Sequence, residues 1–153
     1  MNKQAGFTLI ELVVVIVILG LLAAAALPRF INVTVDARVA SMNGVAGGLR
    51  TAASLARAEY VVSNNNAATT ILMDGQTVTV LTETANIGRG GRPTAVATGI
   101  SQAMPNPDGY GVTYAGGVVT YRPAGGSVTC EVQYTAAALG DPVQVIGTVA
   151  VGC

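Results

Sequence analysis

The chain has 153 residues, enough for one domain with an extension, and 51% of them are hydrophobic whereas only 10% are charged. The formal net charge is +0 and no basic block is present, which excludes binding to nucleic acid or anionic lipid through net charge. The chain contains no histidine, which excludes His-based triads, His metal sites and His general bases, so we expect no catalytic residues, metal or cofactor.

The chain begins with a short polar stretch that leads into a long apolar one. Residues 1–6 are polar with one cation, Lys3, whereas residues 7–27 are almost entirely apolar and end at Pro28. A helix over residues 7–27 is about 31 Å long at 1.5 Å per residue, which matches the hydrocarbon core of a bilayer. The pattern indicates either a membrane anchor or a secretory signal peptide, for which residues 24–26 imitate the cleavage site.

Glu11 is a charged residue inside the apolar stretch, and neither an anchor nor a signal peptide accounts for it. A charge at bilayer depth costs about 2.5–3.5 kcal/mol on insertion scales, so it usually marks a function or a partner. If the chain were cut between Gly6 and Phe7, the new α-amine would lie one helical turn from Glu11. The two charges would then pair within one subunit or between neighbours. The alternative is an interfacial carboxylate whose side chain reaches the lipid headgroups.

The segment Gly6-Phe7-Thr8-Leu9-Ile10-Glu11-Leu12 resembles the class III signal of type IV prepilins and type II secretion pseudopilins. The resemblance implies that a prepilin peptidase removes residues 1–6 as a leader by cleaving after Gly6. It also implies N-methylation of Phe7 and a role for Glu11 in neutralising the N-terminal amine of an adjacent subunit during assembly. The partners that it implies are identical subunits of a helical filament and an inner-membrane pilus assembly machinery.

A long helix is expected to continue beyond Pro28. The resemblance implies that residues 7–28 span the membrane and later form the filament core, and that residues 29–60 pack into a globular head. Apolar residues recur in the second part at alternating spacings of four and three, which is the period of one helical stripe. The stripe consists of Val35, Val39, Met42, Ala46, Leu49, Ala53, Ala56 and Tyr60. We expect it to face a β-sheet.

Glycine and proline interrupt this helical pattern. Gly20 and Pro28 are helix-weakening residues on either side of residues 21–27. In a bilayer the helix should persist, whereas in a filament this stretch would either unwind, as the resemblance implies, or merely kink. Three further glycines of the second half would let another backbone approach closely, either the head's own sheet or a neighbouring subunit. They are Gly44, Gly47 and Gly48.

Residues 61–153 read as short strands separated by turns. Asp74-Gly75 lies between residues 71–73 and 77–81, and Gly116-Gly117 joins residues 112–114 to 118–121, a strong hairpin signal. Residues 106–109, Asn-Pro-Asp-Gly, fit a type I turn, and further strands are expected over residues 127–134 and 143–151. The sequence therefore predicts an α+β chain, with a long helix packed in its second half on an antiparallel sheet of three to five strands, as in the type IV pilin fold.

Two further features of the head lead to expectations. Cys130 and Cys153 form one disulfide if the head lies in an oxidising compartment, and remain two free thiols otherwise. A bridge would resemble the disulfide-bounded C-terminal region of many type IV pilins. Residues 89–92, Arg-Gly-Gly-Arg, lack the Lys-Ser/Thr ending of a phosphate loop, so we expect a flexible loop or a subunit contact there.

The expected function is that of a structural subunit, a type IV pilin held in the inner membrane as a precursor and then part of an extracellular pilus of a Gram-negative bacterium, serving adhesion or motility. Two alternatives are a type II secretion pseudopilin, which forms a periplasmic fibre, and a membrane-anchored enzyme or binding domain. A narrower similarity is to pilins of the mannose-sensitive haemagglutinin type. It rests on residues 28–30, 36–38, 44–49, 74–75 and 130–135.

Overall fold

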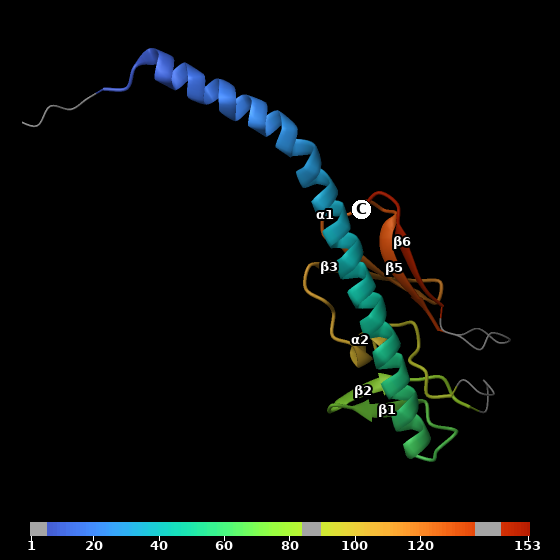
Figure 1. The fold of residues 1–153 in the computed structure, drawn as a ribbon. Coiled ribbons are helices and arrows are strands. Elements are labelled where there is room, and N and C mark those ends of the chain that lie inside the picture. The colour runs from blue at the N-terminus through green and yellow to red at the C-terminus, as the bar shows by residue number, and fades with distance from the viewer. Residues whose placement is uncertain (1–5, 84–89, 137–144) are drawn as a thin grey trace, which may run out of the picture. The chain divides into compact units, whose positions relative to one another are not determined.

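The computed structural model describes residues 6–83, 90–136 and 145–153, and it has one long helix followed by antiparallel sheets (Figure 1). The chain divides into two compact units, Met1–Ala37 and Arg38–Cys153. The elements are α1 (Leu9–Val62), β1 (Thr70–Met73), β2 (Gln76–Thr79), α2 (Ile100–Ala103), β3 (Tyr110–Ala115), β4 (Val118–Pro123), β5 (Cys130–Thr135) and β6 (Val145–Ala150). The predicted α+β class is confirmed.

The head contains two sheets rather than the single sheet that the sequence predicted. Strands β3, β4, β5 and β6 form a four-stranded antiparallel sheet in chain order, whereas β1 and β2 pair only with each other. The small hairpin packs on the last turns of α1, where Ile71, Val78 and Val80 share a buried cluster with Ala56 and Tyr60. A strand pair this short is marginally stable alone, and its contact with the helix supplies the missing apolar burial.

Both two-residue hairpin turns lie where the sequence placed them. Gly116 and Gly117 have φ values of 57° and 75° and connect Ala115 to its partner Val118. Positive φ at both central residues is the requirement of a type I′ turn, which glycine meets without strain. Asp74 and Gly75 adopt the same pattern, with φ values of 46° and 76° between β1 and β2.

The turn before β3 is displaced by one residue from the predicted type I turn over residues 106–109. The backbone N–H of Tyr110 donates to the carbonyl oxygen of Pro107 at 3.2 Å, so the turn comprises residues 107–110. Gly109 therefore occupies the third position, with φ 78°, and not the fourth. Positive φ at the third position is a feature of type II turns, and glycine adopts it without strain. The strand predicted from residue 127 likewise begins later, at Cys130.

The core of the head lies between the helical stripe and one face of the four-stranded sheet. Six of the eight stripe residues are buried, and Val35 and Val39 are only half-buried. Strand β5 alternates buried and half-buried residues, as expected of a sheet with one covered face. The buried side chains of the sheet include Val119, Tyr121, Pro123, Cys130, Val132 and Tyr134.

Tyrosine hydroxyls inside this core have hydrogen-bond partners. The hydroxyl of Tyr134 donates to the carbonyl oxygen of Pro93 at 2.6 Å. Outside the core, the hydroxyl of the exposed Tyr114 donates to Ser101 Oγ at 3.0 Å. Ser101 Oγ also lies 3.0 Å from the hydroxyl of Tyr121. Burial raises the pKa of Tyr121, and this exceeds the opposing effect of the Ser101 hydrogen bond.

The expectation of a flexible loop at residues 89–92 is wrong for Gly90 and Gly91; Arg89 lies outside the described residues. Both glycines are buried, and the carbonyl oxygen of Gly90 accepts a hydrogen bond from Arg57 at 2.7 Å. Gly91 has φ 78°, and a Cβ atom there would lie 2.3 Å from the Cβ atom of Tyr60. Glycine is required because the backbone passes directly against the tyrosine ring.

Candidate functional site

The predicted leader junction lies just before α1. Gly6, Phe7 and Thr8 precede the helix, and both Gly6 and Phe7 are exposed. An added Cβ atom at Gly6 would meet nothing within 4 Å, so the Gly6–Phe7 peptide bond is accessible on this side. The cleavage and methylation predicted at these residues remain predictions.

Glu11 takes part in a hydrogen-bond arrangement that sequence reasoning missed. Its carboxylate accepts from the backbone N–H and the hydroxyl of Thr8, at 3.3 and 3.1 Å, while its own N–H donates to Thr8 Oγ1 at 3.3 Å. This is a capping box, in which a threonine before the helix and a glutamate three residues later satisfy each other's backbone donors. The signal was present in the sequence as Thr-x-x-Glu before an apolar run. The arrangement holds Glu11 at the start of α1, where the helix dipole favours a negative charge.

The apolar first part of α1 is exposed along its length. Its large side chains are between 42% and 81% exposed from Phe7 to Leu27. By length and composition α1 is able to cross a membrane, since its most apolar window has a mean hydropathy of 2.9 and no buried residues. A surface of this kind is unfavourable in water and requires either lipid or other apolar helices around it.

Gly20 and Pro28 both lie inside α1, which runs without interruption from Leu9 to Val62. Pro28 lacks the N–H that would bond to the preceding turn, so the helix has a missing hydrogen bond there. The proposed unwinding or kinking of residues 21–27 in a filament remains a prediction.

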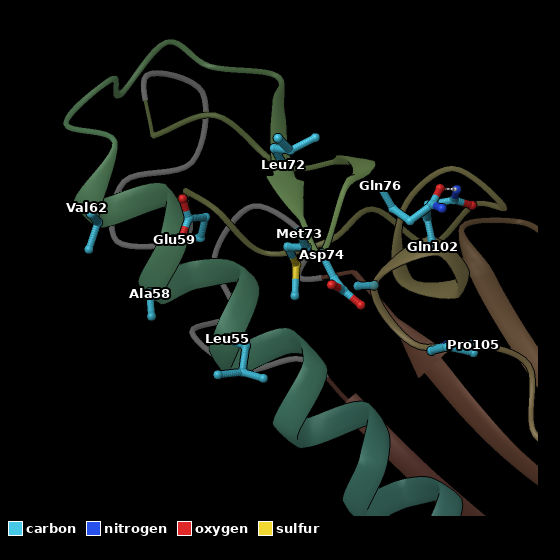
Figure 2. Close-up of a pocket in the computed structure, with 11 residues that line it drawn as sticks. Leu55, Ala58, Glu59, Val62, Leu72, Met73, Asp74, Gln76, Gln102 and Pro105 are labelled. Atoms are coloured by element: carbon cyan, nitrogen blue, oxygen red, sulfur yellow. Dashed lines mark hydrogen bonds between the residues drawn. The ribbon is translucent and has the colours of Figure 1, made fainter.

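A groove of about 510 Å³ opens at the C-terminal end of α1 (Figure 2). One wall is the last turns of α1, and the opposite wall is the β1–β2 hairpin with the residues around α2. Its lining is mainly apolar, but two carboxylates belong to it, Glu59 on the helix and Asp74 in the hairpin turn. In the parts of the chain that the structure describes, neither carboxylate forms an ion pair.

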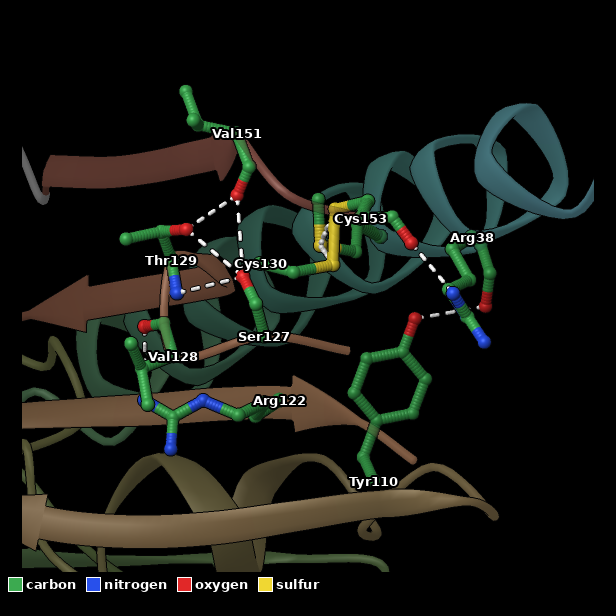
Figure 3. Close-up of a disulfide and its surroundings, with 11 residues drawn as sticks. Arg38, Tyr110, Arg122, Ser127, Val128, Thr129, Cys130, Val151 and Cys153 are labelled. Carbon is green, nitrogen blue, oxygen red and sulfur yellow. Dashed lines mark hydrogen bonds between the residues drawn. A yellow bond between two sulfur atoms is a disulfide. The ribbon is translucent and has the colours of Figure 1, made fainter. Parts of the chain in front are cut away.

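The predicted disulfide is confirmed, because Cys130 at the start of β5 is bonded to Cys153, with their Cα atoms 4.9 Å apart (Figure 3). Both cysteines are buried, and their sulfurs lie 3.6 and 3.9 Å from the sulfur of Met42 on α1. Arg38 donates to the main-chain oxygen of Cys153 at 2.5 Å. The bridge therefore holds the segment after β6 against both β5 and α1.

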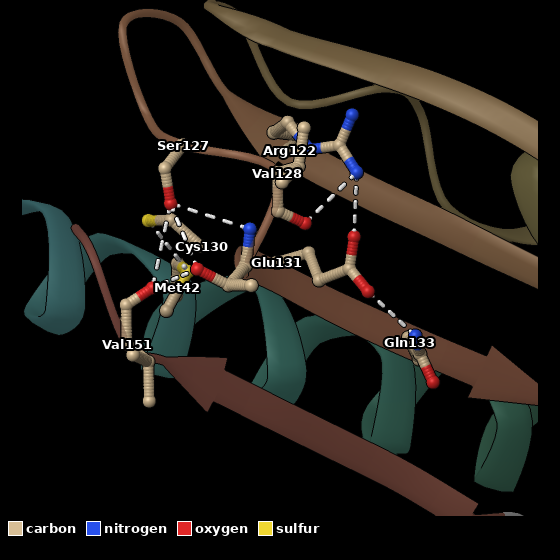
Figure 4. A network of polar contacts seen from close by, with 9 residues as sticks. Met42, Arg122, Ser127, Val128, Cys130, Glu131, Gln133 and Val151 are labelled. Atoms are coloured by element: carbon tan, nitrogen blue, oxygen red, sulfur yellow. Dashed lines mark hydrogen bonds and ion pairs between the residues drawn. The ribbon is translucent and has the colours of Figure 1, made fainter.

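A polar network borders the disulfide on the outer face of the sheet (Figure 4). Arg122 on β4 forms an ion pair with Glu131 on β5 at 2.7 Å and donates to the carbonyl oxygen of Val128 at 3.2 Å. The hydroxyl of Thr129 donates to the carbonyl oxygen of Val151 at 2.5 Å. These contacts join the loop before β5 to the sheet and to the segment after β6. The polar groups of the network therefore stabilise the fold. Among the described residues no group of three or more His, Cys, Asp or Glu side chains is placed to hold a metal ion.

The N-terminal segment is similar to segments of known proteins. Residues 1–27 match the model of the prokaryotic N-terminal methylation motif. The chain is 46% identical over 54 residues to the major component of the type IV narrow pilus of Thermus thermophilus. This match covers 35% of this chain and 47% of that protein. It is 49% identical over 57 residues to a fimbrial protein of Moraxella nonliquefaciens, 37% of each chain. No solved structure is significantly similar to the chain.

The matched motif defines a prepilin-type N-terminal segment, and the helix that follows is long and apolar enough to cross a membrane. With the relatives named above, this N-terminal segment is similar to that of type IV pilus and fimbrial subunits. The chain spans less than half of the length of these relatives, 47% and 37%. Because neither is named as a mannose-sensitive haemagglutinin pilin, that narrower similarity stays a prediction.

Proposed function

We propose that this chain is the structural subunit of a type IV pilus and not an enzyme. The observation that carries the proposal is the Gly6-Phe7 junction followed by Glu11 at the start of a long, exposed, apolar helix. The relatives are named as pilus or fimbrial components, which favours a pilus over a secretion pseudopilus. A lipid-bound precursor and a filament subunit are the two states that would cover such a helix.

In the proposed pathway a prepilin peptidase cuts after Gly6 and methylates the new amine of Phe7. The amine then lies one residue before Thr8, which caps α1 and holds the carboxylate of Glu11. An isolated charge is costly among packed apolar helices, so the amine of one subunit and the carboxylate of another would favour the register in which they pair. The capping box positions the carboxylate for this pairing.

Assembly would exchange lipid for protein around the apolar segment. Residues 7–28 of identical subunits would bury one another in the filament core, while residues 61–153 and the second part of α1 would form the surface. Packing of apolar helices is non-directional, so the charge pair supplies the register. The proposed partners are other copies of the chain, the peptidase and an inner-membrane assembly machinery. The proposed locations are the inner membrane and then an extracellular pilus of a Gram-negative bacterium, serving adhesion or motility.

The test compares two variants of Glu11. Glu11→Ala removes both the charge and the capping contacts, whereas Glu11→Gln keeps a side-chain oxygen for Thr8 and removes only the charge. We expect both variants to insert in the membrane and both to lose sheared surface fibres, measured by electron microscopy and immunoblotting. Asp108→Asn, which removes a charge from an exposed turn, is the matched control and should assemble normally. Normal fibre yield from Glu11→Gln would show that charge pairing is not required.

A further inference from the structure

The groove at the end of α1 leaves large apolar side chains uncovered. Leu55 and Val62 on the helix and Leu72 on the hairpin are 58%, 78% and 63% exposed. Figure 2 shows Leu55, Ala58 and Val62 along α1 on one side and Asp74 in the hairpin turn on the other. Apolar surface arranged as a hollow, and not as scattered single residues, is typical of a binding surface.

The charges of the groove indicate the chemistry of its occupant. Glu59 and Asp74 give the groove a negative charge that no cation balances within the described ranges of the chain. Exposed Arg50 on α1 is a cation whose guanidinium likewise has no ion pair or hydrogen bond among the described residues; only its main-chain oxygen accepts a side-chain hydrogen bond, from Ser54. An occupant with one cation beside small or apolar residues would complement the groove, and the surface around Arg50 has these features.

Arg50 and Glu59 cannot reach each other within one chain. They are nine positions apart, which is about 2.5 helical turns and about 14 Å along the axis, so they lie on opposite flanks of α1. Pairs within a helix form at spacings of three or four. Space for a neighbour exists beside Arg50, because an added Cβ atom at Gly47, one turn before it on the same face, would meet nothing within 4 Å. By contrast, a Cβ atom at Gly48 would lie 3.0 Å from Met104, so this glycine faces the head itself.

We propose that the groove binds the Arg50 side of α1 in a second copy of this chain. The guanidinium would lie between Glu59 and Asp74, and the methylene stem of the arginine would cover Leu55 and Leu72. Because the two surfaces are different, each copy would present Arg50 to one neighbour and its groove to another. A contact between two different surfaces closes into a ring or continues as a filament, and an axial shift between neighbours allows only the filament. With α1 parallel in all copies, the pairing shifts neighbours by about 14 Å along the helix.

This contact rests on the proposed function, and a charge exchange in the full-length chain tests it. Glu59→Arg and Arg50→Glu should each lower the yield of sheared fibres about tenfold, and the double variant should restore it to within about twofold of the wild type. Asp108→Arg makes the same change of charge outside the groove and should leave the yield unchanged. Membrane levels and the Cys130–Cys153 bridge, checked on non-reducing gels, serve as controls for folding.

A second measurement locates the contact directly. A photoreactive residue at position 59 should crosslink two copies, with the product mapped by mass spectrometry to the turns of α1 around Arg50. Crosslinks that map elsewhere, or single reversals that assemble at wild-type yield, would overturn the contact while leaving the filament intact. A double variant no better than the single ones would also overturn it. A wild-type chain that makes no fibres would instead overturn the proposed function.

Discussion

Removing the Cys130–Cys153 disulfide should destabilise the head by a predictable amount. The two cysteines are 23 positions apart, and a loop of this length corresponds to about 3.4 kcal/mol of chain entropy in the unfolded state. For a unit of the size of Arg38–Cys153, this lowers the melting temperature by roughly 10–15 °C. Both sulfurs pack on Met42, and Arg38 binds the main-chain oxygen of Cys153, so these two contacts would weaken as the segment after β6 detaches.

The assay is urea denaturation of the detergent-solubilised full-length chain, with and without reductant. Reduced wild type and the double variant C130A/C153A should both lose about 3 kcal/mol of unfolding free energy, and the double variant should not respond to reductant. A loss below about 1 kcal/mol in both cases would refute the reasoning, because the segment after β6 would then be held by its other contacts. A loss in reduced wild type alone would also contradict it.

Two further predictions concern the head. Gly91→Ala should lower the free energy of unfolding by about 3 kcal/mol or more, because the new Cβ atom would lie 2.3 Å from the Cβ atom of Tyr60 at a positive φ. Gly116→Ala also places alanine at a positive φ, but the space around it is open. It should therefore lower the free energy of unfolding by only about 1 kcal/mol in the same denaturation assay. Burial raises the pKa of Tyr121 in the folded protein. The stability that this tyrosine contributes is therefore fully present below its usual pKa of about 10, and it is lost as the pH rises through the pKa of the folded state. Tyr121→Phe should therefore remove up to about 1.4 kcal/mol per pH unit from the slope of unfolding free energy above pH 10. An unchanged alkaline slope in this variant would contradict the assignment.

Local patterns predicted those parts of the fold that depend on neighbours in the chain. The helical stripe is buried from Met42 to Tyr60, where its period indicated, and Gly116-Gly117 forms the expected hairpin turn because positive φ at two successive residues is a local requirement. Thr8 and Glu11 carry a local signal that the prediction did not include. The charge of Glu11 inside the apolar run indicated a partner, whereas the spacing Thr-x-x-Glu also indicates the capping box that the structure contains.

Features that depend on distant residues were not predictable in the same way. The small hairpin forms its own sheet because its apolar face packs on the end of α1, and no pattern within residues 70–79 specifies that partner. Gly90 and Gly91 read as a flexible loop, yet Arg57 and Tyr60 on α1 hold them in the core. The groove likewise arises from elements far apart in sequence, and its two carboxylates, Glu59 and Asp74, carry no motif.

The most direct test of the pilin assignment is the intact mass of the subunit in purified surface fibres. The account predicts a chain that begins at Phe7, carries one methyl group on its α-amine and contains the Cys130–Cys153 bridge. A subunit that begins at Met1, or one cut after Ala26 as a secretory signal would be, would contradict the proposed processing. Fibres in which this chain is absent would contradict the assignment as a whole.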